Sequence, residues 1–240
     1  MDKLALQNRL RSVQHEIMAA CQNAGIKPNK VQLLAVSKTH PSEMIQWAHE
    51  IGQLDFGENY VQEANAKQKE LSHLPLRWHF IGQLQKNKVK SVVGAFSLIH
   101  SVDSFELAQK IALKAQELNL QQKILLEVNL GDESTKGGFS KALLLEQFHQ
   151  IMELPHLEVA GLMALPPLFD DPEQTRPYFK ELRQLFETLQ THLPPQRQAS
   201  WQWLSMGTTH DFPVAIEEGA NIVRVGTAIF GERQPKIKYV

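Results

Sequence analysis

Two basic residues stand at the ends of apolar strand-like segments, and their types are suited to carbonyl chemistry. Lys38 closely follows the β-leaning run "VQLLAV" at 31–36, and Arg224 interrupts the β-branched run "IVRV" near the C-terminus. A lysine amine forms a Schiff base with a carbonyl once a dry or cationic environment lowers its pKa. An inward arginine needs an anion or another hydrogen-bond acceptor. Because an isolated lysine is usually solvated, Lys38 gains a chemical role only if the fold brings the two together.

Two glycine–threonine turns near the C-terminus add a candidate anion site. They are "LSMGTTHD" at 204–211 and "VGTAIFG" at 225–231, and each follows a strand-like run. Glycine allows close approach of the backbone to a ligand, and the helix that follows directs partial positive charge at an anion. We expect Ser205 to face inward and a phosphate site to be formed by Gly207, Thr208, Thr209, Gly226 and Thr227.

Strand-like segments alternate with helical patterns along the whole chain. The strand-like runs lie at 31–38, 54–59, 77–82, 97–102, 123–129, 157–164, 201–207 and 221–226. The helical patterns between them lie at 42–51, 60–71, 85–92, 104–118, 140–153, 173–190 and 211–218. Crossover helices indicate a parallel sheet, and eight strands close a (β/α)8 TIM barrel. A doubly wound open sheet is the alternative.

An extra amphipathic helix precedes the repeated units. Apolar residues recur at helical spacing over 4–24, and Gly25 follows as a stop signal. No Gly/Ser-rich linker divides the sequence, so we expect residues 1–240 to form a single domain. Barrel closure would make the first and last strands neighbours, about 4.8 Å apart. Lys38 and Arg224 would then face the same mouth, at the C-terminal side where barrels carry out chemistry.

Charge, cysteine content and hydropathy exclude several classes of function. The 240 residues include 25 basic and 26 acidic side chains, which gives no support to binding of nucleic acid or a membrane surface. The single cysteine, Cys21, excludes an intramolecular disulfide and a cysteine-cluster metal site. No apolar run approaches the roughly 18 residues of a membrane span, and the N-terminus is too charged for a signal peptide. We expect a cytoplasmic globular protein.

Other motifs do not support a second site. None of the ten histidines are paired at i,i+4, so we expect no metal site, and His79 and His100 suit ordinary hydrogen-bonded roles near strand ends. The segment "GDESTKGG" at 131–138 lacks the P-loop spacing. The lysines of "QKNKVK" at 85–90 are typical of a solvated helix face, although Lys86 is a candidate for contacting a bound phosphate or a partner enzyme.

A lysine beside a phosphate site allows two kinds of carbonyl ligand. One is a sugar phosphate, as in a class I aldolase, which would purify colourless and form its Schiff base only with substrate. The other is pyridoxal 5′-phosphate (PLP). Arg224 favours PLP, because a flat heteroaromatic nitrogen between the phosphate site and Lys38 would need a donor there.

Five separated blocks occur in a recognisable order. They are "AVSKTHP" (35–41), "FGENYVQEANAK" (56–67), "WHFIGQLQKNK" (78–88), "GLMAL" (161–165), and the two C-terminal turns taken together. On these blocks the chain resembles the PLP homeostasis protein family, also called the YggS or proline synthase co-transcribed family. Proteins of this family look like the barrel domain of alanine racemase standing alone.

The resemblance implies a role for each residue of the site. Lys38 would carry PLP as a Schiff base, and Arg224 would meet the pyridine nitrogen. Where the family usually has Met-Ser after "SMG", this chain has Thr208-Thr209, which still offers a backbone N–H and a hydroxyl. The phosphate would be held by Ser205, Gly207, Gly226 and Thr227, and the ring or the mouth would be lined by Asn59, His79 and Met163.

The resemblance also implies PLP homeostasis: the protein would hold PLP reversibly, buffer it and deliver it, without robust catalysis. An arginine at the pyridine nitrogen makes the ring a weaker electron sink, which leaves a weak amino-acid racemase as the alternative. In the similar racemases the second acid/base group comes from another β domain of the partner subunit, and here the chain ends at Val240, directly after the eighth unit. We therefore expect a monomer, with PLP-dependent client enzymes as candidate partners.

Overall fold

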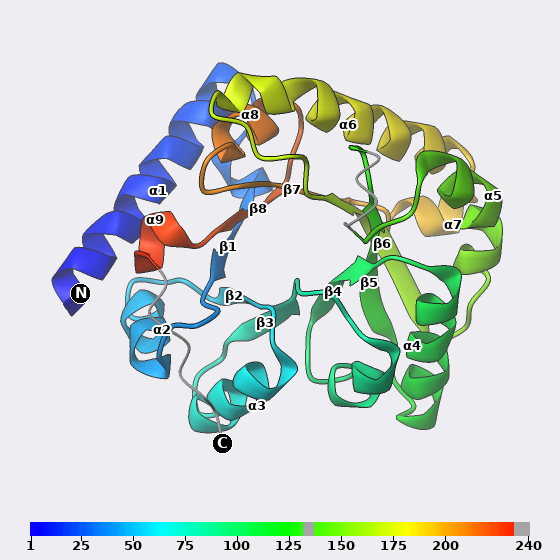
Figure 1. The fold of residues 1–240 in the computed structure, drawn as a ribbon, viewed down its shortest axis with the longest axis horizontal. Coiled ribbons are helices and arrows are strands. Elements are labelled where there is room, and N and C mark those ends of the chain that lie inside the picture. The colour runs from blue at the N-terminus through cyan, green and yellow to red at the C-terminus, as the bar shows by residue number, and fades with distance from the viewer. Residues whose placement is uncertain (132–136, 233–240) are drawn as a thin grey trace.

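The strands form one closed parallel barrel. The computed structural model describes residues 1–131 and 137–232. Within these ranges the strands follow one another in sequence order around the barrel, and β1 pairs with β8 (Figure 1). Their bounds are β1 Gln32–Val36, β2 Asp55–Glu58, β3 Arg77–Phe80, β4 Leu98–Val102, β5 Gln122–Val128, β6 Leu157–Ala164, β7 Trp203–Thr208 and β8 Ile222–Val225. The predicted TIM barrel is confirmed, and the open doubly wound sheet is wrong.

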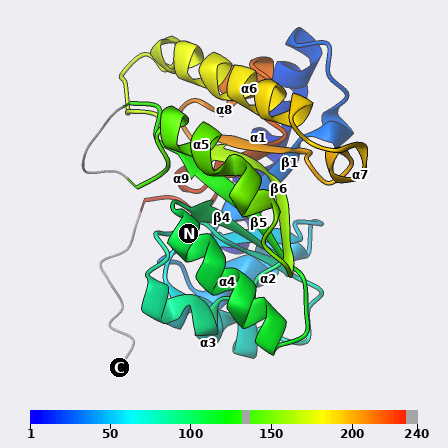
Figure 2. The same cartoon turned by 90° about the vertical axis from the view of Figure 1, so that its right-hand side faces the viewer.

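Helices surround the strands, as Figures 1 and 2 show from two directions. The α-helices are α1 Lys3–Asn23, α2 Ser42–His49, α3 Val61–Glu70, α4 Phe105–Glu117, α5 Lys141–Met152, α6 Arg176–Thr191, α7 Pro195–Gln198, α8 Phe212–Glu217 and α9 Thr227–Phe230. Short 3-10 helices are η1 Pro28–Lys30, η2 Lys86–Ser91 and η3 Pro172–Thr175. The 85–92 pattern forms a 3-10 turn, because Lys88 and Val92 donate to carbonyls three residues back. The predicted N-terminal helix is α1.

Two apolar clusters form on the two sides of the barrel wall. Alternate residues of a strand face opposite sides, so Leu34 lies inside while Ala35 packs against the helices. The inner cluster consists of Leu34, Leu98, Leu125, Ala160, Met163 and Ile222. The interior below the site is therefore partly filled by side chains, and the site occupies only one end of the barrel.

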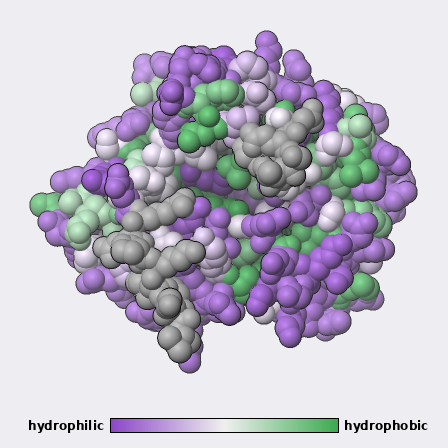
Figure 3. All heavy atoms as spheres, viewed as in Figure 1, coloured by the Kyte–Doolittle hydropathy of each residue, from purple (hydrophilic) through white to green (hydrophobic). Residues whose placement is uncertain are grey.

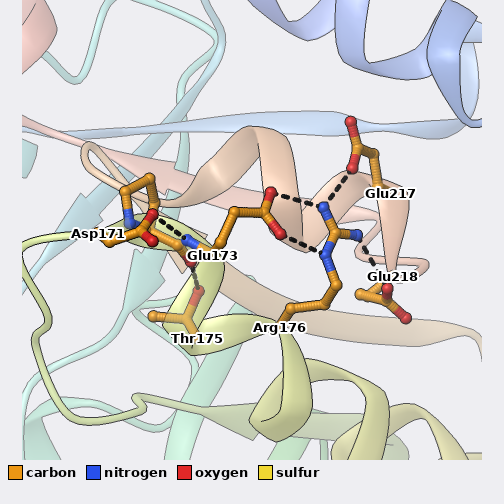
Figure 4. A network of polar contacts seen from close by, with 7 residues as sticks. Asp171, Glu173, Thr175, Arg176, Glu217 and Glu218 are labelled. Carbon is orange, nitrogen blue, oxygen red and sulfur yellow. Dashed lines mark hydrogen bonds and ion pairs between the residues drawn. The ribbon is translucent and has the colours of Figure 1, made fainter.

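An ion-pair cluster joins the loop after β6 to α8. Arg176 donates to Glu173 at 2.7 and 2.8 Å, to Glu217 at 2.7 Å and to Glu218 at 3.0 Å (Figure 4). The Glu173 backbone N–H in turn donates to Asp171 at 3.0 Å. Because these side chains are partly solvated, the cluster adds more to the placement of the loop than to the free energy of unfolding.

The surface seen in Figure 3 is mostly hydrophilic, with hydrophobic residues in small separate patches. Among the described residues, no helix has both the length and the apolar character needed to cross a membrane. Most of the segment 131–138, which the sequence excludes as a P-loop, lies outside the described residues.

Candidate functional site

A pocket of about 400 Å³ opens at the C-terminal ends of the strands. Seven of the eleven residues predicted for the site line it: Lys38, Asn59, Thr208, Thr209, Arg224, Gly226 and Thr227. The rest of the wall is formed by Val36, Ile81, Leu165, Leu168 and His210. Barrel closure thus brings Lys38 and Arg224, the two basic residues furthest apart in the predicted site, to one cavity.

The turn that carries Lys38 is held on both sides by acidic residues. The Ser37 hydroxyl donates to Glu58 Oε1 at 2.7 Å, and the Thr39 backbone N–H donates to Glu63 Oε1 at 2.5 Å. Thr39 has φ 66°, a left-handed conformation that is unfavourable for a β-branched residue. These two bonds therefore fix the direction in which Lys38 leaves the strand.

A buried lysine completes this turn. Lys67 Nζ lies 2.7 Å from the Ser37 carbonyl oxygen, 2.8 Å from Glu58 Oε1 and 2.6 Å from Glu63 Oε1. Burial raises the pKa of Glu58, and the Lys67 ammonium partly offsets this. The sequence block "FGENYVQEANAK" (56–67) contains Glu58, Glu63 and Lys67, but the sequence analysis predicted no role for them. The i,i+4 spacing of Glu63 and Lys67 on α3 was the available signal.

Arg224 is buried at the base of the pocket. Its Nη1 donates to Ser205 Oγ at 2.7 Å and its Nη2 donates to the Ala164 carbonyl at 2.9 Å. Burial lowers the pKa of Arg224 to about 10, although Asp211 and Glu127 act to raise it, so the guanidinium stays protonated at neutral pH. It offers a fixed donor, and not a mobile proton, to a ligand above it.

A bulge between β7 and β8 decides which residues of "LSMGTTHD" reach the pocket. Ser205 pairs with Ile222, whereas Thr208 pairs with Arg224, so three steps on β7 match two on β8. Gly207 supplies the break with φ 87°, and a Cβ there would meet Ala215 Cβ at 2.6 Å. As a result Thr208 lines the pocket, while Ser205 lies below it.

Three donors of the predicted phosphate site have partners within the protein. The Thr208 N–H and hydroxyl donate to Asp211 Oδ1 at 2.7 and 2.9 Å, and the Gly226 N–H donates to Thr209 Oγ1 at 3.2 Å. The Thr208 N–H and hydroxyl, which the sequence analysis predicted to bind phosphate, therefore stabilise the conformation of this loop. The first intrahelical bond of α9 comes from Ile229, so the N–H groups at the start of this helix remain for a ligand.

Four predicted site residues do not line the pocket. Met163 belongs to the inner apolar cluster, and Gly207 packs against α8. His79 and Ser205 are buried in the barrel interior, each hydrogen-bonded to His100. For His79, Met163 and Ser205 the physical reason is depth, because these side chains face inward but lie below the level of Lys38. For Gly207 the reason is the bulge, which turns this residue towards α8.

Glu127 is a half-buried carboxyl on the inward side of β5 that sequence reasoning missed. It shares the inward side of β5 with Leu125. Burial and the nearby Asp103 raise its pKa to about 7, and Arg224 partly opposes this. Among residues 1–131 and 137–232, no group of three or more His, Cys, Asp and Glu could hold a metal ion.

Comparison with known proteins identifies the family. The alanine racemase N-terminal domain family matches residues 9–234. A pyridoxal phosphate homeostasis protein of Aquifex aeolicus is 47% identical over 226 residues, which cover 94% of this chain and 97% of the relative. The chain belongs to the pyridoxal phosphate homeostasis protein family.

Solved structures agree with this family assignment. PipY of Synechococcus elongatus, a protein solved with PLP bound, is 40% identical and aligns with a TM-score of 0.82 over 94% of this chain and 100% of PipY. An alanine racemase of Bartonella henselae, solved with covalently bound pyridoxal phosphate, is 14% identical and aligns with a TM-score of 0.65. This alignment covers 92% of this chain and 59% of the racemase, and at this identity it shows the shared barrel fold alone.

Proposed function

We propose that this chain binds PLP as a Schiff base on Lys38 and acts in PLP homeostasis, by buffering the cofactor and delivering it to client enzymes. The observation that carries the proposal is that Lys38, Arg224 and the N-terminal end of α9 line one pocket. A relative at 40% identity binds PLP on the same fold. The protein acts in the cytoplasm as a monomer.

The residues present fit the cofactor. Asn59 Oδ1 lines the pocket region, is buried and has no hydrogen-bond partner among the described residues, which leaves it for a ligand group. A Cβ on Gly226 would lie 3.2 Å from the Val36 carbonyl oxygen, so the backbone of this turn lies against the end of β1. Lys38, Arg224 and the start of α9 together suit a ligand that carries an aldehyde, an acceptor nitrogen and a phosphate.

Each protein group has a defined task. When bound, PLP supplies an aldehyde that reacts with amines. The turn held by Glu58 and Glu63 aims Lys38 into the pocket, and Arg224 donates to an acceptor nitrogen without releasing its proton. The leucines of the loop after β6 shield one side of the pocket, although Leu168 is 83% exposed. This arrangement binds and orients a reactive aldehyde at a site open to exchange.

Borohydride reduction tests the covalent attachment. Reduction of the PLP-loaded protein fixes the bond, and peptide mapping should then find the label on Lys38. In Lys38→Ala we expect the visible band and the label to be lost while the far-ultraviolet circular dichroism is unchanged. Lys90→Ala, an exposed lysine on η2, is the matched control. A full visible band in Lys38→Ala would contradict the assignment, and a band that forms only with a sugar phosphate would favour the aldolase.

A weak amino-acid racemase is the second candidate, because a lysine in this position can also act as a base. Incubation of the PLP-loaded protein with single L-amino acids in heavy water, followed by proton NMR, separates the two functions. Exchange of the α-proton no faster than with free PLP is the expected result. Enzyme-like exchange that disappears in Lys38→Ala would replace the carrier function with a catalytic one.

A further inference from the structure

Two histidines in the barrel interior contact each other below the pocket. His79 lies on β3 and His100 on β4, and both side chains are buried. His79 Nδ1 is 3.0 Å from His100 Nε2. Each ring has a second polar partner: His100 Nδ1 lies 2.9 Å from Ser205 Oγ, and His79 Nε2 lies 3.3 Å from Asp55 Oδ1.

The outer partners extend these contacts to both ends of the barrel. Ser205 Oγ accepts from Arg224, which lines the pocket at the C-terminal ends of the strands. Asp55 is the first residue of β2, at the opposite end, and accepts two hydrogen bonds from Arg77 at 2.7 and 2.6 Å. A continuous hydrogen-bonded chain therefore crosses the interior from the exposed Arg77 to the pocket.

The chemistry of the two ends sets the direction of every bond. Asp55 in its ionised form only accepts, so a neutral His79 carries its hydrogen on Nε2 and accepts at Nδ1. His100 must then donate from Nε2 and accept at Nδ1, where the Ser205 hydroxyl donates. The free lone pairs of Ser205 face Arg224, which can only donate. In this direction each donor meets an acceptor.

The reverse direction leaves a group unsatisfied. It would require a His79 cation and a His100 Nδ1–H that donates to Ser205 Oγ, which already accepts from Arg224. The Ser205 hydroxyl hydrogen would then have no acceptor among the hydrogen bonds of the described residues. Burial, together with the Arg224 charge, also holds the pKa of His100 well below its usual range, which keeps this ring neutral.

We infer that the chain Ser205–His100–His79–Asp55 is a positioning device for Arg224. It locks two N–H groups of the guanidinium onto Ser205 and the Ala164 carbonyl, and so directs the remaining N–H edge at the acceptor nitrogen of a bound ligand. Each donor in such a chain polarises the next, so Asp55 acts on Arg224 from the far end of the barrel. The expected effect on PLP binding rests on the proposed function. The direction of the hydrogen bonds from Ser205 to Asp55 depends on the protein alone.

The ligand-free protein tests the direction. Long-range 15N–1H NMR spectra distinguish the tautomers of histidine, and His79→Gln and His100→Gln assign the two rings. Both rings should be neutral with the hydrogen on Nε2 at pH 7. A cationic ring, or a hydrogen on Nδ1 of either ring, would overturn the inference, whether or not the protein binds PLP.

The PLP-loaded protein tests the consequence. His100→Leu interrupts the chain, and the loss of one fixed donor to the ligand should weaken PLP binding about tenfold and shift the visible band. His100→Gln can accept from Ser205 and donate to His79, so it should restore both properties. Leu185→Ala, buried on the outer side in α6, controls for lowered stability and should leave the band in place.

Failure of the inference and failure of the proposed function are distinguishable. If the wild-type protein does not bind PLP, the proposed function fails and the tautomers still decide the direction of the chain. If wild type and a folded His100→Leu bind PLP with the same affinity and the same band, the positioning role is wrong while PLP binding stands.

Discussion

Glu127 is an acidic residue of the barrel interior whose pKa lies close to neutral pH. Its folded pKa of about 7 lies well above its ordinary value of 4.5, mainly because burial disfavours the charged form and Asp103 adds repulsion. The carboxyl therefore favours the folded state in its protonated form. Its contribution to stability is fully present below pH 4.5 and is lost as the pH rises through 7.

Glu127→Gln should reveal this dependence. Glutamine resembles the protonated carboxyl at every pH, so the variant and the wild type should differ little at pH 5. At pH 8 the variant should be more stable by about 1–3 kcal/mol, since the wild type then holds a half-buried carboxylate. Urea unfolding of the ligand-free proteins at the two pH values measures the difference. An equal difference at both pH values would contradict the shifted pKa.

At the scale of elements, α3 positions the end of β1. Lys67 and Glu63 project from this helix onto the turn of Ser37 and Thr39, and β2 contributes Glu58 between them. Three charges buried together are stabilising only while all are paired, because a lone buried charge is costly. The cluster therefore ties the direction of Lys38 to the docking of α3.

Lys67→Met should lower the free energy of unfolding by about 3–5 kcal/mol, because it leaves two buried carboxylates without their cation. The double variant Lys67→Met/Glu58→Gln should recover part of this loss. Chemical denaturation measures both, and Lys69→Met, an exposed lysine on the same helix, should stay close to wild type. A double variant no more stable than Lys67→Met would argue against the pairing of Lys67 with Glu58.

At the scale of the whole molecule, α1 covers the side of the barrel where β8 meets β1. The helices on either side of β8 in the sequence are short, since α8 before it has 6 residues and α9 after it has 4. α1 packs against α2, α8 and α9 and buries one apolar face, formed by Leu6, Leu10, Val13, Ile17 and Cys21. Closure of the barrel beside Lys38 and Arg224 thus relies on a segment outside the eight repeated units.

Leu10→Ala tests this dependence and the single-domain prediction together. Leu10 is fully buried, so its truncation should cost about 2–5 kcal/mol. If residues 1–240 unfold as one unit, tryptophan fluorescence and far-ultraviolet circular dichroism should shift together in urea. Two separated transitions in the variant would show that α1 detaches from an intact barrel, and the single-domain prediction would fail.

The sequence by itself determined the barrel and the partners at its mouth. Strand alternation and crossover helices are local patterns, and eight such strands favour a closed barrel over an open sheet, so the meeting of Lys38 with Arg224 could be predicted without coordinates. The resemblance of five blocks added the family and the expected cofactor. The boundaries of the single domain and the contacts with PLP stay predictions.

Only the tertiary structure decided the depth of each side chain. Alternation tells which side of a strand a residue faces, but the bulge at Gly207 moves Thr208, and not Ser205, level with Arg224. Likewise the chain from Asp55 through His79 and His100 joins three strands, and the Lys67 cluster joins a helix to a turn. Such contacts depend on the register between elements, which no local pattern specifies, and this is why the sequence predicted the residues of the pocket better than the groups that position them.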